Sequence, residues 1–245
     1  MSNLPFVSCL TPTFERRNFL PILLDIFQRQ TYPENKRELI ILDDSAKSNE
    51  DIIVGFQKKF PTVQIKYHYS QERIALGKKR NMLNDLATGE YIVYMDDDDY
   101  YPSDKIKFTI MRMIAQKSKF SGSSELHIYF TDTKQIYRFN KLGQNHSTAG
   151  TFCFHRDYLQ SHKFEDDAMK SEERVFLDEY KTQQIQIDPF KSILCIAHFK
   201  NTFDKRNLIG RLVKTNLKLK NFVSEKHLVQ FYESIDTTKP ETIVS

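Results

Sequence analysis

Short apolar runs alternate with helix-like segments over the first half of the chain. Most of these runs are continuous and end in polar loops, as buried strands do, whereas residues 63–69 alternate like a half-exposed strand. Such alternation is typical of a parallel sheet that helices cover on both faces. The predicted strands span residues 6–10, 38–43, 63–69 and 90–95, and the predicted helices span residues 19–30, 51–60, 76–88 and 104–116, with Gly89 ending the third helix and Ser103 capping the fourth.

The pattern changes after about residue 122. Strands are predicted for ELHIYFTD, KQIYRFN, GTFCFHR and SILCIAHF, and a helix is predicted for KSEERVFLDEYK. The remaining residues favour one or two basic amphipathic helices. Because there is no repeat or low-complexity linker, we predict one α/β domain over residues 1–203, with halves at 1–104 and 105–203, followed by a basic helical tail over 204–245.

Polar side chains of the first half gather where the predicted strands end. The strings TPTF, DDS and DDDD each follow an apolar run. In open parallel sheets, ligands bind outside the carboxyl ends of the strands, so these three loops are the expected ligand site.

The four adjacent carboxylates of Asp96 to Asp99 repel one another, and they need either open solvent or a cation. Mg²⁺ and Mn²⁺ prefer carboxylate oxygens and keep positions for water and substrate phosphates. The position after a buried parallel strand favours the cation over a solvated acidic turn. On an extended backbone, Asp96 and Asp98 would point to the same side.

A basic cluster, Lys78 to Arg80, lies near the start of the helix just upstream. Helix N-termini favour anions, and arginine adds bidentate phosphate contacts. Lysines on helices are mostly solvated, and we expect this of Lys78 and Lys79. Arg80 and Asn81 are the better candidates for ligand contact.

The composition and net charge of the chain exclude few further classes of protein. The 245 residues carry a net charge of +4, too mild a bias to indicate nucleic acid. The three cysteines are odd in number and lack zinc spacing, so buried free thiols are expected. No signal peptide or membrane-spanning run is evident, which favours a reducing, cytoplasmic setting without a transmembrane segment.

The strand-end motifs follow one another in a known order. VSCLTPTFERR, LIILDDSAKSNED and KRNMLNDLATGEYIVYMDDDD resemble, across residues 6–104, the nucleotide-sugar-binding half of family 2 glycosyltransferases with the GT-A fold. GTFCFHRDYL and KSEERVFLDEY continue the resemblance more weakly. The resemblance implies a Rossmann-like, mostly parallel central sheet flanked by helices, and an inverting enzyme that uses a nucleotide sugar.

The resemblance also implies roles for single residues. The implied donor-binding residues are Thr11, Pro12, Thr13, Arg16, Asp44, Arg80, Asp96 and Asp97. Asp98 is the implied carboxylate ligand of Mn²⁺ or Mg²⁺, with Asp99 in reserve, and His198 matches a histidine that binds the metal or the diphosphate.

An acid at the start of a late helix is the catalytic base in inverting members of the family. Glu173 matches that acid, with Glu172 beside it, although the family usually has aspartate there. The competing interpretation is an N-capping box with Ser171 as its cap, and both can hold at once.

These roles imply that a sugar moves from a nucleoside diphosphate, most often UDP, to an acceptor hydroxyl of a glycan, protein or lipid. A sugar nucleotidyltransferase is one alternative, but its glycine-rich phosphate loop has no counterpart in TPTFERR. A non-catalytic, cation-dependent binding module is another. Its basic tail would bind nucleic acid, yet the tail lacks interleaved aromatic residues. We expect the tail to pack on the domain, form a homodimer or dock on a membrane surface.

Overall fold

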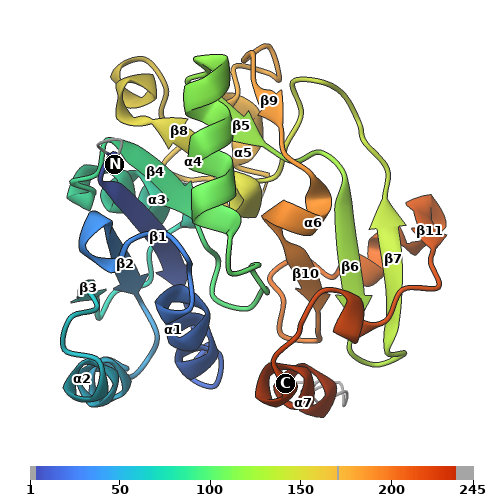
Figure 1. The fold of residues 1–245 in the computed structure, drawn as a ribbon, viewed down its shortest axis with the longest axis horizontal. Coiled ribbons are helices and arrows are strands. Elements are labelled where there is room, and N and C mark those ends of the chain that lie inside the picture. The colour runs from blue at the N-terminus through green and yellow to red at the C-terminus, as the bar shows by residue number, and fades with distance from the viewer. Residues whose placement is uncertain (1–3, 170, 236–245) are drawn as a thin grey trace.

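The structure of the protein is a computed structural model that describes residues 4–169 and 171–235. Its larger sheet has seven strands in the order β3-β2-β1-β4-β8-β5-β9 (Figure 1). The first four strands in that order are parallel, β8 is antiparallel to both neighbours, and β9 is parallel to β5. The strands are β1 (Val7–Thr13), β2 (Arg37–Asp43), β3 (Ile65–Tyr69), β4 (Tyr91–Tyr94), β5 (Phe120–Gly122), β8 (Cys153–His155) and β9 (Ile185–Gln186). The predicted α/β fold with a mostly parallel central sheet is confirmed.

A second sheet of four strands has the order β10-β6-β7-β11. Its strands are β6 (Leu126–Phe130), β7 (Gln135–Phe139), β10 (Leu194–Ala197) and β11 (Leu212–Lys214). The sequence predicts the first three of these strands, but it does not predict β11, which adds an antiparallel edge strand from within the tail.

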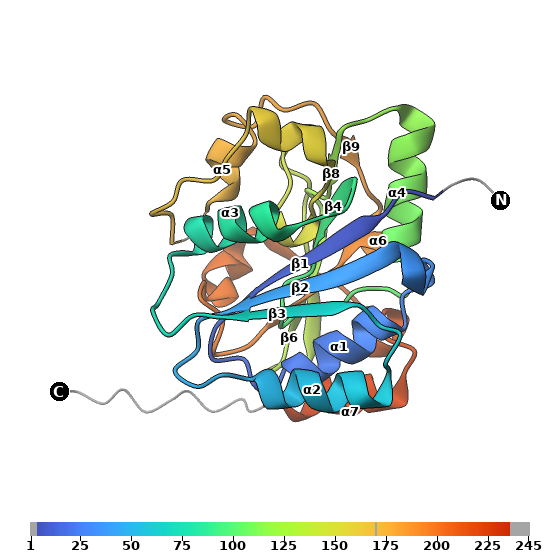
Figure 2. The ribbon, with the colours of Figure 1, turned by 90° about the vertical axis from the view of Figure 1, so that its left-hand side faces the viewer.

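Helices cover both faces of the larger sheet (Figure 2). Leu10 of β1 faces a core shared with α3 and α5, whereas Val7 and Cys9 face a core shared with α1, α2, α4 and α7. Both faces of β1 are therefore buried, which explains its continuous apolar pattern. The helices are α1 (Leu20–Gln28), α2 (Glu50–Lys59), α3 (Leu76–Leu86), α4 (Lys105–Gln116), α5 (Glu173–Phe176), α6 (Pro189–Ser192) and α7 (Lys226–Ser234), and short 3₁₀ helices span Glu34–Lys36, Ala149–Thr151, Arg156–Gln160, Lys205–Arg211 and Leu219–Asn221.

Several predicted boundaries shift. β1 continues through the Thr-Pro-Thr segment, which the sequence assigns to a loop. Gly89 does not end α3, which stops at Leu86. A Cβ atom at Gly89 would lie 2.5 Å from the backbone nitrogen of Ser8, so the glycine permits close approach of two backbones. Asp104, not Ser103, precedes α4.

The tail packs on the domain through α7. Phe231 meets the ring of Phe19 edge-on at 5.5 Å, and the Tyr232 hydroxyl donates to the backbone oxygen of Asp99 at 3.2 Å. The free cysteines Cys9, Cys153 and Cys195 are buried, as predicted. None of the described helices has the length and apolar content needed to span a bilayer.

Candidate active site

The carboxyl ends of β1, β2 and β4 bring the three predicted polar loops together (Figure 2). Thr11 is buried and donates from its hydroxyl to the Met95 backbone oxygen at 2.5 Å, which joins β1 to the acidic loop. Pro12 pairs with Leu42 inside the sheet. Thr13, the last residue of β1, is also buried.

The acidic loop, Asp96 to Asp99, turns at residues 97–98 instead of continuing as an extended strand. Its four carboxylates have different surroundings, and the extended backbone on which Asp96 and Asp98 would point to the same side is not formed. Asp99 is buried and accepts a hydrogen bond from the Ile196 backbone nitrogen at 2.8 Å. Burial raises the pKa of Asp99 to about 7. Burial, and then the charge of Asp98, raises the pKa of Asp97.

Arg80 joins the acidic loop to the start of α5. Its Nε lies 2.7 Å from Oε1 of Glu172, and its Nη1 lies 3.2 Å from Oδ1 of Asp96. The guanidinium also lies over the ring of Tyr94, 4.7 Å from the centroid. Burial alone would lower the pKa of Arg80, but the two carboxylates raise it above its ordinary value. Arg80, a predicted donor contact, therefore fixes two acidic segments that lie far apart in the sequence.

Lys79 is buried, so the prediction that it is solvated is wrong; Lys78 is exposed as expected. The ammonium of Lys79 donates to the Thr13 backbone oxygen at 2.9 Å and pairs with Oδ1 of Asp44. The other carboxylate oxygen of Asp44 pairs with Arg73 and accepts from the Ile74 backbone nitrogen at 2.8 Å. Asp44 is thus buried and held beside the end of β1 by Lys79, Arg73 and the Ile74 backbone.

Asn81 does not face the acidic loop. Its amide exchanges hydrogen bonds with the backbone of Phe164, at 2.9 and 3.0 Å, and donates to Asp166 at 2.7 Å. The neighbouring strand-end acid, Asp43, accepts from the Ser45 hydroxyl at 2.6 Å and shapes its own loop. Both residues build the walls of the site.

Asp98 and His198 meet across the site, with 3.1 Å between Oδ2 and Nε2. The same carboxylate oxygen accepts from the Asn201 amide at 3.1 Å and lies 3.4 Å from Nε of Arg16. Burial opposes ionisation of Asp98, but His198 and nearby cations lower its pKa below the ordinary value. Burial lowers the pKa of His198. Asp98 is therefore ionised at neutral pH.

That donor set fits a divalent cation. Among residues 4–169 and 171–235, no group of three or more histidine, cysteine, aspartate or glutamate side chains is arranged to hold a metal. A protein site for Mg²⁺ commonly supplies one or two carboxylates, and substrate phosphates and water complete the coordination. Asp98 and His198, with Phe19 stacked on the imidazole at 4.8 Å, match that incomplete type of site.

Glu172 and Glu173 begin α5 on the opposite side of the site. Glu172 is buried against Arg80, whereas Glu173 is half-buried. Burial, followed by the charge of Glu172, raises the pKa of Glu173 to about 7. Ser171 has a left-handed backbone with φ of 54°, and Glu172 occupies the N-cap position without a side-chain cap, so the capping-box interpretation is wrong. A carboxyl group with this pKa is suited to take a proton near neutral pH.

Three further residues help to form the site, and the sequence does not predict them. Asn201 follows His198 by three residues, which is a spacing that indicates a turn. Tyr101 accepts from the Asp96 backbone nitrogen at 2.6 Å. A Cβ atom at Gly150 would lie 3.0 Å from Oδ2 of Asp96, so a side chain at this position would crowd that carboxylate.

A parallel sheet with an aspartate run at its ligand edge, joined to an acidic helix start by a buried arginine, is the architecture of a GT-A transferase. The family model described as glycosyl transferase family 2 matches residues 8–163. The chain therefore belongs to glycosyl transferase family 2.

Two similar proteins are also named as glycosyltransferases. A putative teichuronic acid biosynthesis glycosyltransferase, TuaG of Bacillus subtilis, is 27% identical over 118 residues, which cover 48% of this chain and 45% of that protein. A poly(ribitol-phosphate) beta-glucosyltransferase of Bacillus spizizenii is 31% identical over 101 residues, which cover 41% of this chain and 16% of that protein. The chain thus matches less than half of the length of these relatives.

Solved structures share the fold. S. aureus TarS in complex with UDP-GlcNAc superposes with a TM-score of 0.65 at 16% identity, covering 78% of this chain and 58% of that one. The mannosyltransferase PcManGT from Pyrobaculum calidifontis, in complex with GDP-Man and Mn²⁺, also gives 0.65 at 16% identity, covering 86% and 61%. At this identity, the likeness establishes the GT-A fold.

Proposed function

We propose that the protein is a metal-dependent, inverting glycosyltransferase that moves a sugar from a UDP-sugar to an acceptor hydroxyl of a glycan, protein or lipid. The observation that carries the proposal is the buried Asp96–Arg80–Glu172 ion network. It holds the acidic loop and the start of α5 together, so a metal-binding carboxylate and a proton-accepting carboxylate would face the same reaction centre. The donors named in the two related structures support a nucleotide sugar.

The acidic loop stabilises the leaving group in this proposal. Asp98 and His198 would hold Mn²⁺ or Mg²⁺, and Asp99, which bonds to the backbone of β10, would support the loop. A bound divalent cation supplies positive charge to the departing diphosphate. Arg16 adds a second positive charge close to Asp98.

The nucleoside would bind along the carboxyl ends of β1, β2 and β4. Thr11 and Pro12 shape this edge from within the sheet, and Thr13 would contact the nucleotide. Asp44 would accept from the base or ribose, and Asp96 or Asp97 would meet the ribose. Arg80 acts on the donor through Asp96, whose position it fixes.

Glu173 would be the general base, and its neighbour Glu172 would position it. Glu172 forms an ion pair with Arg80, whereas Glu173 is half-buried with a pKa of about 7. Proton removal by Glu173 during attack of the acceptor hydroxyl gives a single displacement, which inverts the configuration of the anomeric carbon.

We place the reaction in the cytoplasm, because the three free, buried thiols suit a reducing setting. The partners are the donor and acceptor, without nucleic acid. The exposed lysines of the tail, Lys214, Lys218 and Lys220, would make a homodimer contact or bind anionic headgroups of a membrane surface.

Donor screening tests the proposal. Nucleotide sugars are added with Mn²⁺, Mg²⁺ or a chelator, and the midpoint of thermal unfolding and the released nucleotide are measured. We expect a UDP-sugar to raise the midpoint only with the metal, and slow hydrolysis to release free UDP. Release of pyrophosphate from a sugar phosphate and UTP would instead identify a nucleotidyltransferase. Stabilisation by no nucleotide sugar would overturn the proposal.

A further inference from the structure

Lys105 is a buried cation to which the proposed reaction gives no role. It is the first residue of α4, and 2% of its surface is exposed. Burial lowers the pKa of its ammonium to about 8, so the group is still mostly protonated at neutral pH. Burial of a charge is costly, and the start of a helix disfavours a cation. Natural proteins keep such unfavourable features mainly at functional sites, so the lysine calls for a functional explanation.

The two partners of this ammonium carry no charge. A lysine nitrogen has three hydrogen-bond donors. In the part of the chain that the structure describes, Nζ of Lys105 makes one hydrogen bond, to the Gly150 backbone oxygen at 3.1 Å. It also lies 4.3 Å from the centroid of the Tyr101 ring, which is within the range of a cation–π contact. Among the described residues, therefore, no ion pair accounts for the lysine.

Both partners lie against Asp96. The Tyr101 hydroxyl accepts from the Asp96 backbone nitrogen at 2.6 Å. Gly150 is the middle residue of a short 3₁₀ helix, and a Cβ atom there would lie 3.0 Å from Oδ2 of Asp96, so its backbone lies close to that carboxylate. Arg80 approaches the other oxygen, Oδ1, at 3.2 Å. Lys105 thus joins the group that holds the backbone of Asp96 to the group that lies against its carboxylate.

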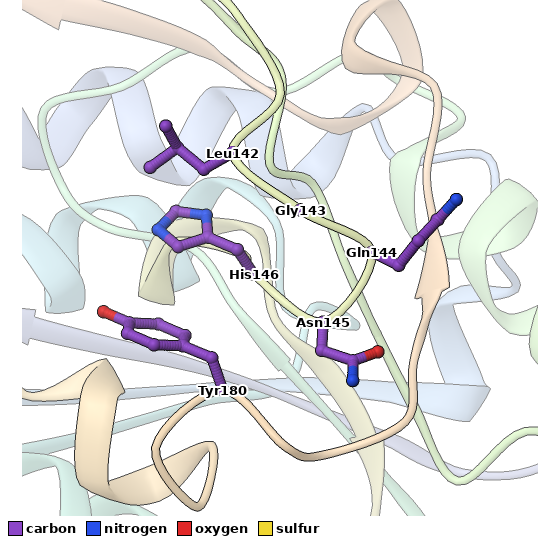
Figure 3. A pocket seen from close by; sticks show the side chains of 6 residues that line it. All are labelled: Leu142, Gly143, Gln144, Asn145, His146 and Tyr180. Carbon is purple, nitrogen blue, oxygen red and sulfur yellow. The ribbon is translucent and has the colours of Figure 1, made fainter.

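The lysine does not belong to the surface cavity shown in Figure 3. That cavity has a volume of about 450 Å³ and is lined by residues 142–146 and Tyr180. Lys105, Tyr101 and Gly150 are not part of its lining. The printed contacts of the ammonium lead to Asp96 and not to this cavity.

We propose that Lys105 is a positioning residue of the donor site, which holds Tyr101 and the Gly150 backbone against Asp96 and so fixes the carboxylate that meets the nucleotide. The inference rests on the proposed function, in which Asp96 is a donor contact. Lys105 acts only through its two neighbours. Such indirect support matters, because a displacement of about 1 Å in a group that orients a substrate can reduce the rate by about 10²-fold.

Lys105→Met tests the inference, because methionine fills a similar volume and carries no charge. Replacing a buried charged group with an apolar one is often neutral or stabilising, so the midpoint of thermal unfolding should stay level or rise. The affinity for UDP with Mn²⁺, measured by calorimetry, should nevertheless fall by about twofold to thirtyfold. In the protein without ligand, the Asp96 amide should exchange its hydrogen faster by NMR, because its acceptor Tyr101 is less firmly held.

Tyr101→Phe tests the same contact from its other side, since it removes the hydroxyl that accepts from Asp96. It should also weaken UDP binding and speed exchange at the Asp96 amide. The double variant should lose less affinity than the product of the two single losses, because both changes act on one carboxylate. Lys107→Met is the matched control, since it makes the same substitution at an exposed position of α4, and it should leave UDP affinity and exchange unchanged.

Unchanged UDP affinity in Lys105→Met would overturn the inference. So would a lower unfolding midpoint with unchanged exchange at the Asp96 amide, which would show a packing role alone. Exchange is measured without ligand and separates the two proposals. If the wild-type protein binds no UDP while exchange at Asp96 rises in Lys105→Met, the proposed function falls and the positioning of Asp96 stands. If the wild-type protein and Lys105→Met bind UDP equally tightly, only the inference falls.

Discussion

The acidic loop and the start of α5 place similar carboxyl groups in one site under opposite electrostatic conditions. Asp98 faces His198, Arg16 and Asn201, and its pKa lies below the ordinary value. Glu173 has Glu172 as its neighbour, and burial and that charge raise its pKa to about 7. One group therefore stays ionised, and the other exchanges a proton near neutral pH.

This contrast separates the two tasks of the proposed reaction. A group that holds a cation must remain charged, whereas a general base must gain and lose a proton at the working pH. Arg80 supports the contrast, because its two ion pairs are with Asp96 and Glu172. Replacing Arg80 removes the link between the two acidic segments, and changes at Asp98 and in the protonation of Glu173 test its two ends separately.

Arg80→Met should cause the largest loss of stability. It leaves Asp96 and Glu172 without their partner at the edge of the core, which costs roughly 3–5 kcal/mol of unfolding free energy. Arg17→Ala is the control, because its ion pair with Asp51 is exposed and should contribute far less to stability. Urea denaturation measures both. Equal losses would show that Arg80 does not link the two segments energetically.

Asp98→Asn should weaken donor binding in the presence of Mn²⁺ by at least about tenfold, because the amide has no charge to offer a cation. Without metal, the variant and the wild-type protein should bind the donor alike. Asp51→Asn, on the exposed face of α2, serves as the control. Titration calorimetry with UDP decides the matter, and an unchanged metal-dependent affinity would remove Asp98 from the metal site.

The rate of transfer should rise with pH through about 7. A base must be deprotonated, and the raised pKa of Glu173 keeps it protonated and inactive below that value. The rate should therefore fall roughly tenfold for each pH unit below the pKa and level off above it. Asp98 stays ionised across this range, so UDP affinity should change far less. A rate that is flat from acid to neutral pH would contradict the contrast between the two carboxyl groups.

Tyr232→Phe should have the smallest effect. It removes the hydrogen bond from α7 to the Asp99 backbone, which is worth about 1 kcal/mol. Ser234→Ala, which removes a hydrogen bond within the exposed surface of α7, should cost less. Thermal unfolding compares the two variants. A Tyr232→Phe protein as stable as Ser234→Ala would show that the tail does not support the acidic loop.

The sequence predicts the parallel half of the fold well, because its signals are local. The three continuous apolar runs between Phe6 and Met95 become the buried strands β1, β2 and β4, and the alternating run becomes the half-exposed strand β3. The burial of Lys79 could not be predicted in this way, because it depends on an ion pair with Asp44, which lies 35 residues away in the sequence. β11 pairs with β7 across the second sheet, and no local pattern in the basic tail reveals that partner.

Some features of the site can also be predicted from the sequence, whereas others cannot. Asp98 and His198 are predicted separately, and the structure brings them within 3.1 Å of each other. The position of Arg80 between two acids, and the turn within the acidic loop, follow from tertiary contacts that residue types alone do not specify. The roles of these residues in the reaction stay predictions.

The most direct test of the account compares transfer and donor binding in Glu173→Gln. The amide keeps the size of the side chain and cannot accept the acceptor proton, so transfer should fall by about 10²–10⁴-fold while UDP-sugar affinity stays within about twofold of wild type. Glu179→Gln, an exposed acid after α5 that pairs with Arg174, is the matched control and should keep full activity. A Glu173→Gln protein that transfers sugar at the wild-type rate would contradict the assignment of the base and the division of labour between the two carboxyl groups.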